Sequence, residues 1–386
     1  MYRNYSGDMQ GDAEHFFKNA SGGIDGLSLL EISLISEGSL AIFIWSSVFN
    51  FMNNLGFPRE HYIGVMVNVL IMSLNAVVLF KITRLLFGID PNRFKRMLLF
   101  VSTCGLFWIF SGVLHRDSLI LLFVNIFLYI WLKYLSRIGY NYNLILLIIS
   151  SFIAFISFGF LRTEFSFLPF AFAGAACFSL LFCPTSTNKV VYSTLFLPVI
   201  AISINLFLLN YGTSLFSTLL RGHESYSTAF ITTNSSDSLG MSLIVNQPLP
   251  LRLILGSIYL YVFPVPFWTG FQLSTVYHLF KSFNVIFFYF IIPLLILSIR
   301  HLLMYRCYRT PQLMFCLFVV VGFTLAIAGT SLETRHIGAF FGPVFILGLI
   351  PNLDKKNVWC NYRNVLSLTL IFIFSIHLFW LTIKFI

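Results

Sequence analysis

The sequence predicts an all-α fold: a polytopic integral membrane bundle of about 10–12 transmembrane helices. Of its 386 residues, 58% are hydrophobic and 10% are charged, and the mean hydropathy is +0.86. A water-soluble domain carries about 25% charged residues. Because lipid offers backbone groups no hydrogen-bond partner, the long apolar runs must form helices. The composition therefore excludes a soluble globular protein.

Each predicted crossing is an apolar run suited to about 30 Å of hydrocarbon at about 1.5 Å per residue. The crossings are residues 62–80, 97–113, 118–132, 143–160, 165–182, 190–209, 284–299, 312–330, 337–350 and 364–383. Residues 251–283 are predicted to enter the bilayer and return, because YVFPVPF, with Pro264 and Pro266, is unfavourable for a continuous helix. A full crossing there would also move the basic loop at 300–309 to the outer side.

Lysine and arginine in short loops mark the cytoplasmic side of a membrane protein. The loops assigned to this side contain Lys81, Arg84, Arg93, Lys95, Arg96, Lys133, Arg137, Lys189, Arg300, Arg306, Arg309, Lys355, Lys356 and Arg363. Among the acidic residues, only Asp90 and Asp354 fall there, so the outer side has a different chemistry. The net charge of +10 is spread over these loops, which indicates orientation and no nucleic-acid partner.

The chain is predicted to form one domain, 1–386. Its parts are an acidic external loop with short membrane-surface helices (1–61), a helical core (62–209), an external loop with a re-entrant segment (210–283) and C-terminal helices (284–386).

The polar N-terminal segment leaves two alternatives for its location. Either it lies outside and follows a span that this chain lacks, or it is cytoplasmic and 39–56 is the first crossing. The six cysteines show no zinc-binding spacing and are interpreted as packing residues.

Four charged clusters interrupt the apolar sequence, and all four are assigned to the outer side: 115–117, 162–164, 221–224 and 333–336. An ionisable group at helix depth costs about 2.5–3.5 kcal/mol, so such groups usually face a cavity, a partner or the interface. Guanidinium groups bind phosphate through two parallel hydrogen bonds. The alternatives are that the arginines reach toward lipid headgroups, that Asp117 caps a helix, and that 333–336 anchors the chain at the interface. The expected substrate-binding residues are His115, Arg116, Arg162, Glu164, Arg221, Arg335 and His336.

The acidic N-terminal segment GDMQGDAEHFFKNA supplies candidate bases, Asp12 or Asp8. Its helical start is amphipathic and suited to a membrane surface. The alternative interpretation is a solvated acidic loop. Asp8 and Asp12 are also able to bind a divalent metal, although the sequence contains no complete ligand set.

The order of these motifs resembles the membrane glycosyltransferases called GT-C and the related O-antigen and exopolysaccharide polymerases. The resemblance lies in Asp12, Phe16 and Ala20 of an acidic external loop, then HRDSLILLF, GFLRTEFSFLPF and ETRHIGAFFGPVF. It implies a GT-C-like bundle in the bacterial inner membrane, with its active site facing the periplasm. It further implies a polyprenyl-(di)phosphate-linked sugar donor and a lipid-linked or glycan acceptor.

By position, the resemblance makes Asp12 or Asp8 the general base, and Arg116, Arg162 and Arg335 ligands of the departing phosphate, assisted by His336 or His115. The expected function is glycosyl transfer in cell-surface polysaccharide synthesis, either as a repeat-unit polymerase or by addition of a single sugar. A transporter or flippase of lipid-linked sugars is the alternative, because intramembrane arginines would also line a transport path. A non-catalytic membrane scaffold is a third.

Overall fold

The computed structural model describes residues 10–22, 31–32, 38–136, 141–183, 244, 247–264, 267–268, 271, 276–330 and 332–385. These residues form helices and connecting turns, with no strand among them. The chain divides into two compact units, each described by itself: unit 1 (Met1–Pro169 and Leu273–Phe280) and unit 2 (Phe170–Gln272 and Lys281–Ile386). The single-domain organisation stays a prediction.

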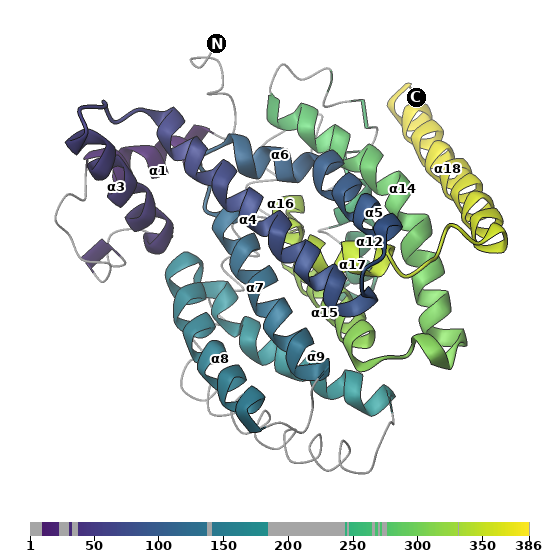
Figure 1. Ribbon diagram of the computed structural model, residues 1–386. Coiled ribbons are helices and arrows are strands. Elements are labelled where there is room, and N and C mark those ends of the chain that lie inside the picture. The colour runs from purple at the N-terminus through teal and green to yellow at the C-terminus, as the bar shows by residue number, and fades with distance from the viewer. Residues whose placement is uncertain are drawn as a thin grey trace. The chain divides into compact units, whose positions relative to one another are not determined.

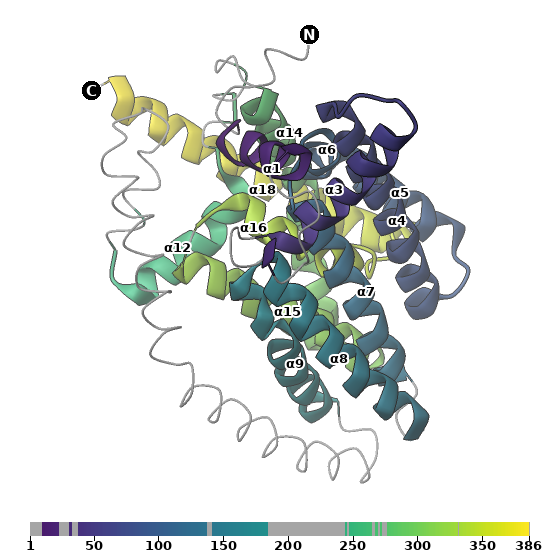
Figure 2. The ribbon, with the colours of Figure 1, turned by 90° about the vertical axis from the view of Figure 1, so that its left-hand side faces the viewer.

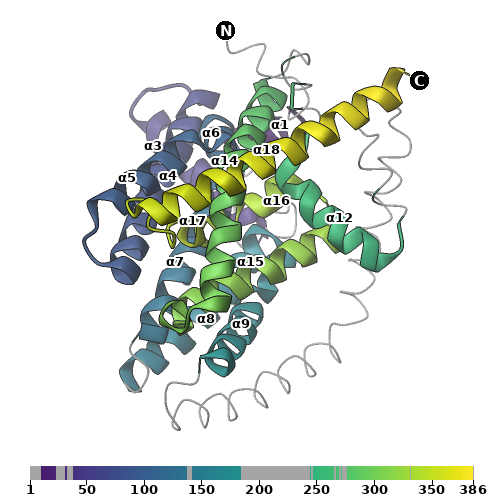
Figure 3. The same cartoon turned by 90° about the vertical axis from the view of Figure 1, so that its right-hand side faces the viewer.

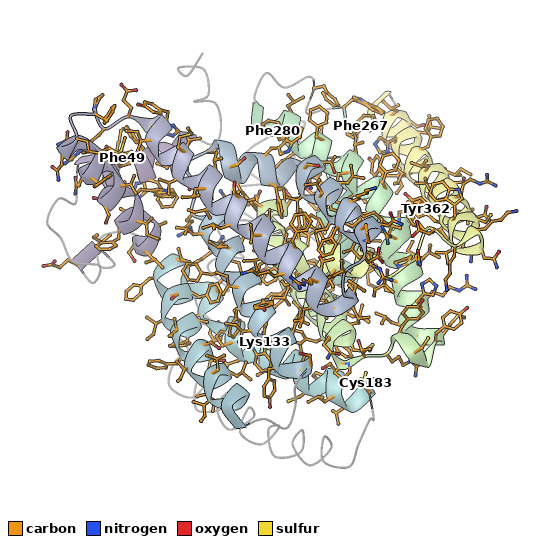
Figure 4. All side chains as sticks on the ribbon, viewed as in Figure 1. Phe49, Lys133, Cys183, Phe267, Phe280 and Tyr362 are labelled. Atoms are coloured by element: carbon orange, nitrogen blue, oxygen red, sulfur yellow. The ribbon has the colours of Figure 1, made fainter. Side chains whose placement is uncertain are left out.

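Unit 1 is a helical bundle in which α7 is the central, mostly buried helix. Its elements are α1 (Gln10–Gly22), α3 (Ser39–Asn54), α4 (His61–Phe87), α5 (Pro91–Thr103), α6 (Gly105–Gly112), α7 (Asp117–Ser136), α8 (Asn141–Leu161) and the 3-10 turn η2 (Thr163–Phe167). α4 and α8 both pack on α7, and α1 packs on α3 (Figures 1 and 2). Phe49 of α3 meets the ring of Phe17 edge-on at 5.7 Å (Figure 4).

Unit 2 is a second group of helices, in which α15 has the most extensive packing. Its elements are α9 (Leu168–Phe182), which begins at the unit boundary, α12 (Leu249–Val262), α14 (Val276–Met304) from Lys281 onward, the turn η3 (Arg306–Tyr308), α15 (Pro311–Gly329), α16 (Thr334–Gly338), α17 (Phe341–Gly348) and α18 (Lys356–Phe385). α15 packs against α12 and α17. α18 lies beside α14 (Figure 3), where the hydroxyl of Tyr362 donates to the carbonyl oxygen of Phe290.

Capping residues set the start of two helices at the loops assigned to the cytoplasmic side. The Asp90 carboxylate accepts from the backbone N–H of Asn92 (3.0 Å) and Arg93 (3.3 Å), and Pro91 follows it. Thr310 likewise accepts from the N–H of Leu313, again with proline next in the chain. An acceptor before a proline satisfies free helix N–H groups while the proline presets the backbone angle, which fixes where each helix begins.

The protein is an all-α polytopic membrane protein. Within the described residues, six helices are long and apolar enough to cross a membrane: His61–Phe87, Asp117–Ser136, Phe165–Phe182, Leu279–Met304, Pro311–Gly329 and Lys356–Phe379. The bent pair α5 and α6 would make a seventh. All six overlap predicted crossings, and α8 coincides with the predicted run 143–160. The predicted span 190–209 lies outside the described residues, so the total of 10–12 stays a prediction.

The predicted crossing 97–113 is a bent pair of helices, which together are long and apolar enough to make one span. α5 and α6 meet at a 58° bend at Cys104, whose backbone is extended. The Trp108 indole N–H donates to the carbonyl oxygen of Ser102 (2.8 Å), and the Thr103 hydroxyl donates to that of Leu99 (2.6 Å). These side chains satisfy carbonyl groups next to the break, which lowers its cost.

The predicted crossing 337–350 consists of two separate short helices, α16 and α17, and its crossing stays a prediction. The segment nevertheless follows α14 for much of its length. Lys281 of α14 meets Glu333, Phe288 meets Phe341, and the Ser298 hydroxyl donates to the carbonyl oxygen of Leu347 (2.6 Å). These contacts extend from Lys281 to Ser298 of α14, about 26 Å along the helix. Every residue from 336 to 350 is buried, and irregular backbone is tolerated at membrane depth where protein surrounds it.

The stretch 251–283 is interrupted, as its prolines predict. α12 ends at Val262, and α14 begins at Val276. Between them, Phe267 (Figure 4) packs against α18, where its backbone N–H donates to Nε2 of His377 (3.2 Å). Its predicted return to the same side of the membrane stays a prediction.

Candidate functional site

The turn His115–Asp117 forms the buried base of a site in unit 1. Nδ1 of His115 lies 2.9 Å from Oδ2 of Asp117, and both side chains are almost completely buried. Asn68 of α4 supports the turn by donating to the carbonyl oxygen of Val113 (2.7 Å), while its own carbonyl accepts from the Trp45 indole N–H (3.2 Å). These hydrogen bonds of Asn68 hold the turn against α3 and α4. Asp117 also occupies the first turn of α7, where a negative charge favours the helix.

Arg116 links this turn to α1 and to the end of α8. Its guanidinium carbon lies 5.8 Å from the ring centre of Phe16, and its Nη1 donates to the carbonyl oxygen of Leu161 (3.3 Å). The Phe16 ring also contacts Trp45 and His115, at centroid distances of 5.7 and 6.0 Å. The structure therefore brings together α1, the 115–117 turn and the end of α8.

Gly38 closes the space beside Arg116. Its φ of +80° is a left-handed conformation. A Cβ atom there would lie 3.0 Å from Cδ of Arg116 and 3.1 Å from Cε1 of Phe16. Ser39, the next residue, donates to the carbonyl oxygen of Phe160 (3.1 Å) and so ties the start of α3 to the end of α8.

Arg162 lies directly after α8, in extended backbone before η2. It is partly buried, and its guanidinium carbon lies 5.7 Å from the ring centre of Phe165. Since Arg116 bonds the carbonyl of the preceding residue, Leu161, the two arginines belong to one region of unit 1. Two guanidinium groups of this kind favour an anion.

The other residues predicted for this region are described in part. Asp12 lies in α1, one helical turn before Phe16, and its side chain is not described. Glu164 lies in η2 and is likewise known only by its backbone position. Asp8 and Arg221 lie outside the described residues. Within those residues, no group of three or more His, Cys, Asp or Glu side chains is arranged to hold a metal ion; metal binding by Asp8 and Asp12 stays a prediction.

Arg335 and His336 belong to unit 2, in a second polar group that we call the Glu333 cluster. It consists of the ion pair Lys281–Glu333, the chain neighbours Ser282, Thr334, Arg335 and His336, and Tyr259 of α12. Nζ of Lys281 lies 3.5 Å from Oε1 of Glu333, and both side chains are mostly buried. Burial raises the pKa of the Glu333 carboxyl, but the charges of Lys281, Arg335 and His336 outweigh this effect and lower it to about 2. Glu333 is therefore an ionised carboxylate at neutral pH.

Three hydroxyl groups of the Glu333 cluster are buried and, among the residues that the structure describes, have no hydrogen-bond partner: those of Tyr259, Ser282 and Thr334. Tyr259 is within electrostatic reach of Glu333. An unpaired buried polar group costs about 1–3 kcal/mol. Such groups commonly mark a bound water or a ligand site.

Sequence reasoning missed Lys281 and Tyr259. Lys281 stands in HLFKSFNVIFF, between apolar residues, just as Arg162 does, so the same criterion would have selected it. Tyr259 carries no comparable signal, because tyrosine is common at membrane interfaces. Its position becomes informative only when α12 is seen to lie against Ala328, Thr330 and Leu332.

No family model matches the chain, and no curated protein or solved structure matches it. The resemblance to GT-C enzymes therefore rests on the motifs of the sequence alone.

Proposed function

We propose that this protein is an integral membrane glycosyltransferase. It uses a sugar donor linked to polyprenyl phosphate or diphosphate at the periplasmic face of a bacterial inner membrane, in cell-surface polysaccharide synthesis. The observation that carries the proposal is the meeting in unit 1 of α1, which contains Asp12, with the Arg116 turn and the end of α8 before Arg162. An acidic helix beside Arg116, with Arg162 directly after the end of α8, suits a reaction that needs a base and an anion site.

The proposed reaction is a substitution at the anomeric carbon of the donor. The acceptor hydroxyl loses its proton to the Asp12 carboxylate, and its oxygen forms the bond to C1 of the sugar. The bond from C1 to the phosphate oxygen breaks, and its electron pair leaves with the lipid phosphate. Arg116 and Arg162 stabilise the negative charge that develops on this phosphate. The same scheme serves repeat-unit polymerisation and the addition of a single sugar.

His115 has a positioning role in this proposal. It is 2% exposed and bonds Asp117, so it holds the turn from which Arg116 projects. We therefore expect His115→Ala to reduce activity by displacing Arg116.

Asp12→Asn tests the proposed base. With purified full-length protein, a labelled polyprenyl-linked donor and a glycan acceptor, we expect sugar transfer to fall by at least about 100-fold, because general-base catalysis contributes about 10²–10⁴-fold. Glu14→Gln is the matched control: Glu14 lies in the same helix, is exposed and pairs only at the surface with Lys18. Equal activity of Asp12→Asn and Glu14→Gln would refute Asp12 as the base.

A flippase of lipid-linked sugars is the second candidate, and one observation favours it. Asn125 donates to Asn75 (2.7 Å) between α4 and α7, and both are completely buried inside predicted crossings. Buried polar groups at membrane depth occur along transport paths. Movement of labelled donor across vesicles without any new glycosidic bond would favour the flippase.

A further inference from the structure

The helix α12 lies along the end of α15 and brings Tyr259 to the Glu333 cluster. Arg252 of α12 donates to the carbonyl oxygens of Ala328 (3.3 Å) and Thr330 (2.8 Å), which end α15. One turn further, Gly256 approaches so closely that a Cβ atom would lie 2.8 Å from Leu332. Tyr259 comes one turn after Gly256 and thus reaches the level of Glu333.

The buried hydroxyl groups of the Glu333 cluster call for a ligand that both donates and accepts hydrogen bonds. Tyr259, Ser282 and Thr334 are 7%, 0% and 4% exposed, so bulk water does not satisfy them. Each hydroxyl donates one hydrogen bond and accepts others. The hydroxyl groups of a sugar have the same capacity, whereas a phosphodiester, which carries no hydroxyl, only accepts.

The Lys281–Glu333 pair itself also favours a sugar over a bare phosphate, although Arg335 and His336 add positive charge beside it. The Glu333 carboxylate is already matched by the Lys281 ammonium, so the pair contributes no net charge. A carboxylate accepts strong hydrogen bonds from sugar hydroxyls, and an ammonium group donates to sugar oxygens. A phosphate placed against Glu333 would instead meet a like charge.

We propose that the Glu333 cluster is a sugar-binding site, in which Glu333, Lys281 and the Tyr259, Ser282 and Thr334 hydroxyls bind hydroxyl groups of a glycan substrate. This inference rests on the proposed glycosyl transfer and specifies a binding site for the glycan in unit 2. Arg335 stands next in the chain, as the candidate ligand for a phosphate attached to that sugar.

A pair of tyrosine variants on one helix tests the site. The Tyr261 hydroxyl is 2.8 Å from that of Thr324 and is satisfied within the protein, whereas that of Tyr259 is unpaired. Tyr261→Phe should therefore lower the thermal midpoint of the ligand-free protein. Tyr259→Phe should leave it unchanged or raise it, because that variant removes an unsatisfied group.

Ligand binding is measured as the shift in the thermal midpoint of unfolding of the detergent-purified full chain. The ligands are free hexoses and N-acetylhexosamines and, separately, inorganic phosphate. We expect at least one sugar to stabilise wild type and Tyr261→Phe, and to bind Tyr259→Phe about three- to tenfold more weakly, as expected for one lost hydrogen bond. Thr334→Val should weaken the binding of the same sugar.

Two results would overturn the proposal. In one, Tyr259→Phe weakens only the response to phosphate, which would make the cluster an anion site. In the other, neither Tyr259→Phe nor Thr334→Val changes the response to any probe. The measurement needs no turnover, so Asp12→Asn should bind the sugar like wild type. Sugar binding by a protein that transfers no sugar would refute the proposed function and leave this site intact.

Discussion

At the residue scale, Gly38 offers a test of how tightly the Arg116 region is packed. Gly38 and Gly56 have nearly the same φ, +80° and +85°, but a Cβ atom at Gly56 would meet nothing within 4 Å. Both alanine variants should lose about 1–2 kcal/mol from the left-handed backbone. We expect Gly38→Ala to lose about 1 kcal/mol more and to reduce sugar transfer, since Arg116 must move. Chemical denaturation of both variants measures this difference, and equal losses with equal activity would contradict it.

Glu333 should make unit 2 sensitive to acid. Its folded-state pKa of about 2 lies below the ordinary value of 4.5. Because the pKa is lower in the folded state, the ionised Glu333 carboxylate stabilises the fold. This contribution is fully present above pH 4.5 and is lost as the pH falls from 4.5 toward 2. It amounts to at most about 3 kcal/mol, reduced by solvent screening.

The measurement is the thermal midpoint of wild type and Glu333→Gln between pH 7 and pH 3. The advantage of wild type over the variant should shrink as the pH drops below 4.5. A constant difference across this range would show that Glu333 is not the titrating group.

Charged residues flanked by apolar sequence were the most predictable part of the site. Arg116 and Arg162 stand out in this way, and the structure places them in one region of unit 1. The contacts that give them neighbours were not predictable from local sequence. Phe16 is one of 46 phenylalanines, and nothing in its surroundings singles it out as the residue beside Arg116.

At the element scale, α1 is held to unit 1 through Phe16, which is 5% exposed. Phe16→Ala should cost about 3–5 kcal/mol, as truncation of a buried aromatic ring does, and should also release α1 from Arg116. Phe51→Ala in α3 is the control, because Phe51 is 62% exposed and should lose less than about 1 kcal/mol. Protease protection of α1 and thermal unfolding report the two effects. Similar losses in both variants would contradict this role of Phe16.

Hydropathy predicted where apolar elements lie better than it predicted their continuity. The runs at 97–113 and 337–350 are apolar throughout, so composition gave no sign of a break in either. In the first, Trp108 reaches back to Ser102 after the chain has bent. This hydrogen bond to a carbonyl group beside the break forms only in the folded geometry, so the sequence does not show it. In the second, burial of the whole segment makes a broken backbone tolerable.

At the scale of the whole molecule, the broken segment α16–α17 decides the sidedness of the C-terminal part. If it crosses the membrane alongside α14, the loop containing Cys307 and the loop containing Lys355 lie on the same side. Both positions are exposed. In a Cys360→Ser background, a membrane-impermeant maleimide should label Cys307 and Lys355→Cys from the cytoplasmic side only. Labelling from opposite sides would show that the segment does not cross.

The overall class of the protein follows from composition, and its function does not. High hydropathy and few charges require a bundle of membrane helices, as the structure confirms. Function depends instead on a few polar residues, each placed by distant parts of the chain: 52 residues separate Lys281 from Glu333. Spacing along the sequence cannot reveal such pairs.

The most direct test of the proposed transfer is the stoichiometry of the reaction in vesicles containing the purified protein. A polyprenyl-diphosphate-linked sugar, labelled in both the lipid and the sugar, is supplied with a glycan acceptor. We expect one molecule of sugar-free polyprenyl diphosphate for each glycosidic bond formed, and loss of both products in Asp12→Asn. Donor that crosses the membrane intact, with no sugar-free lipid and no new bond, would contradict glycosyl transfer.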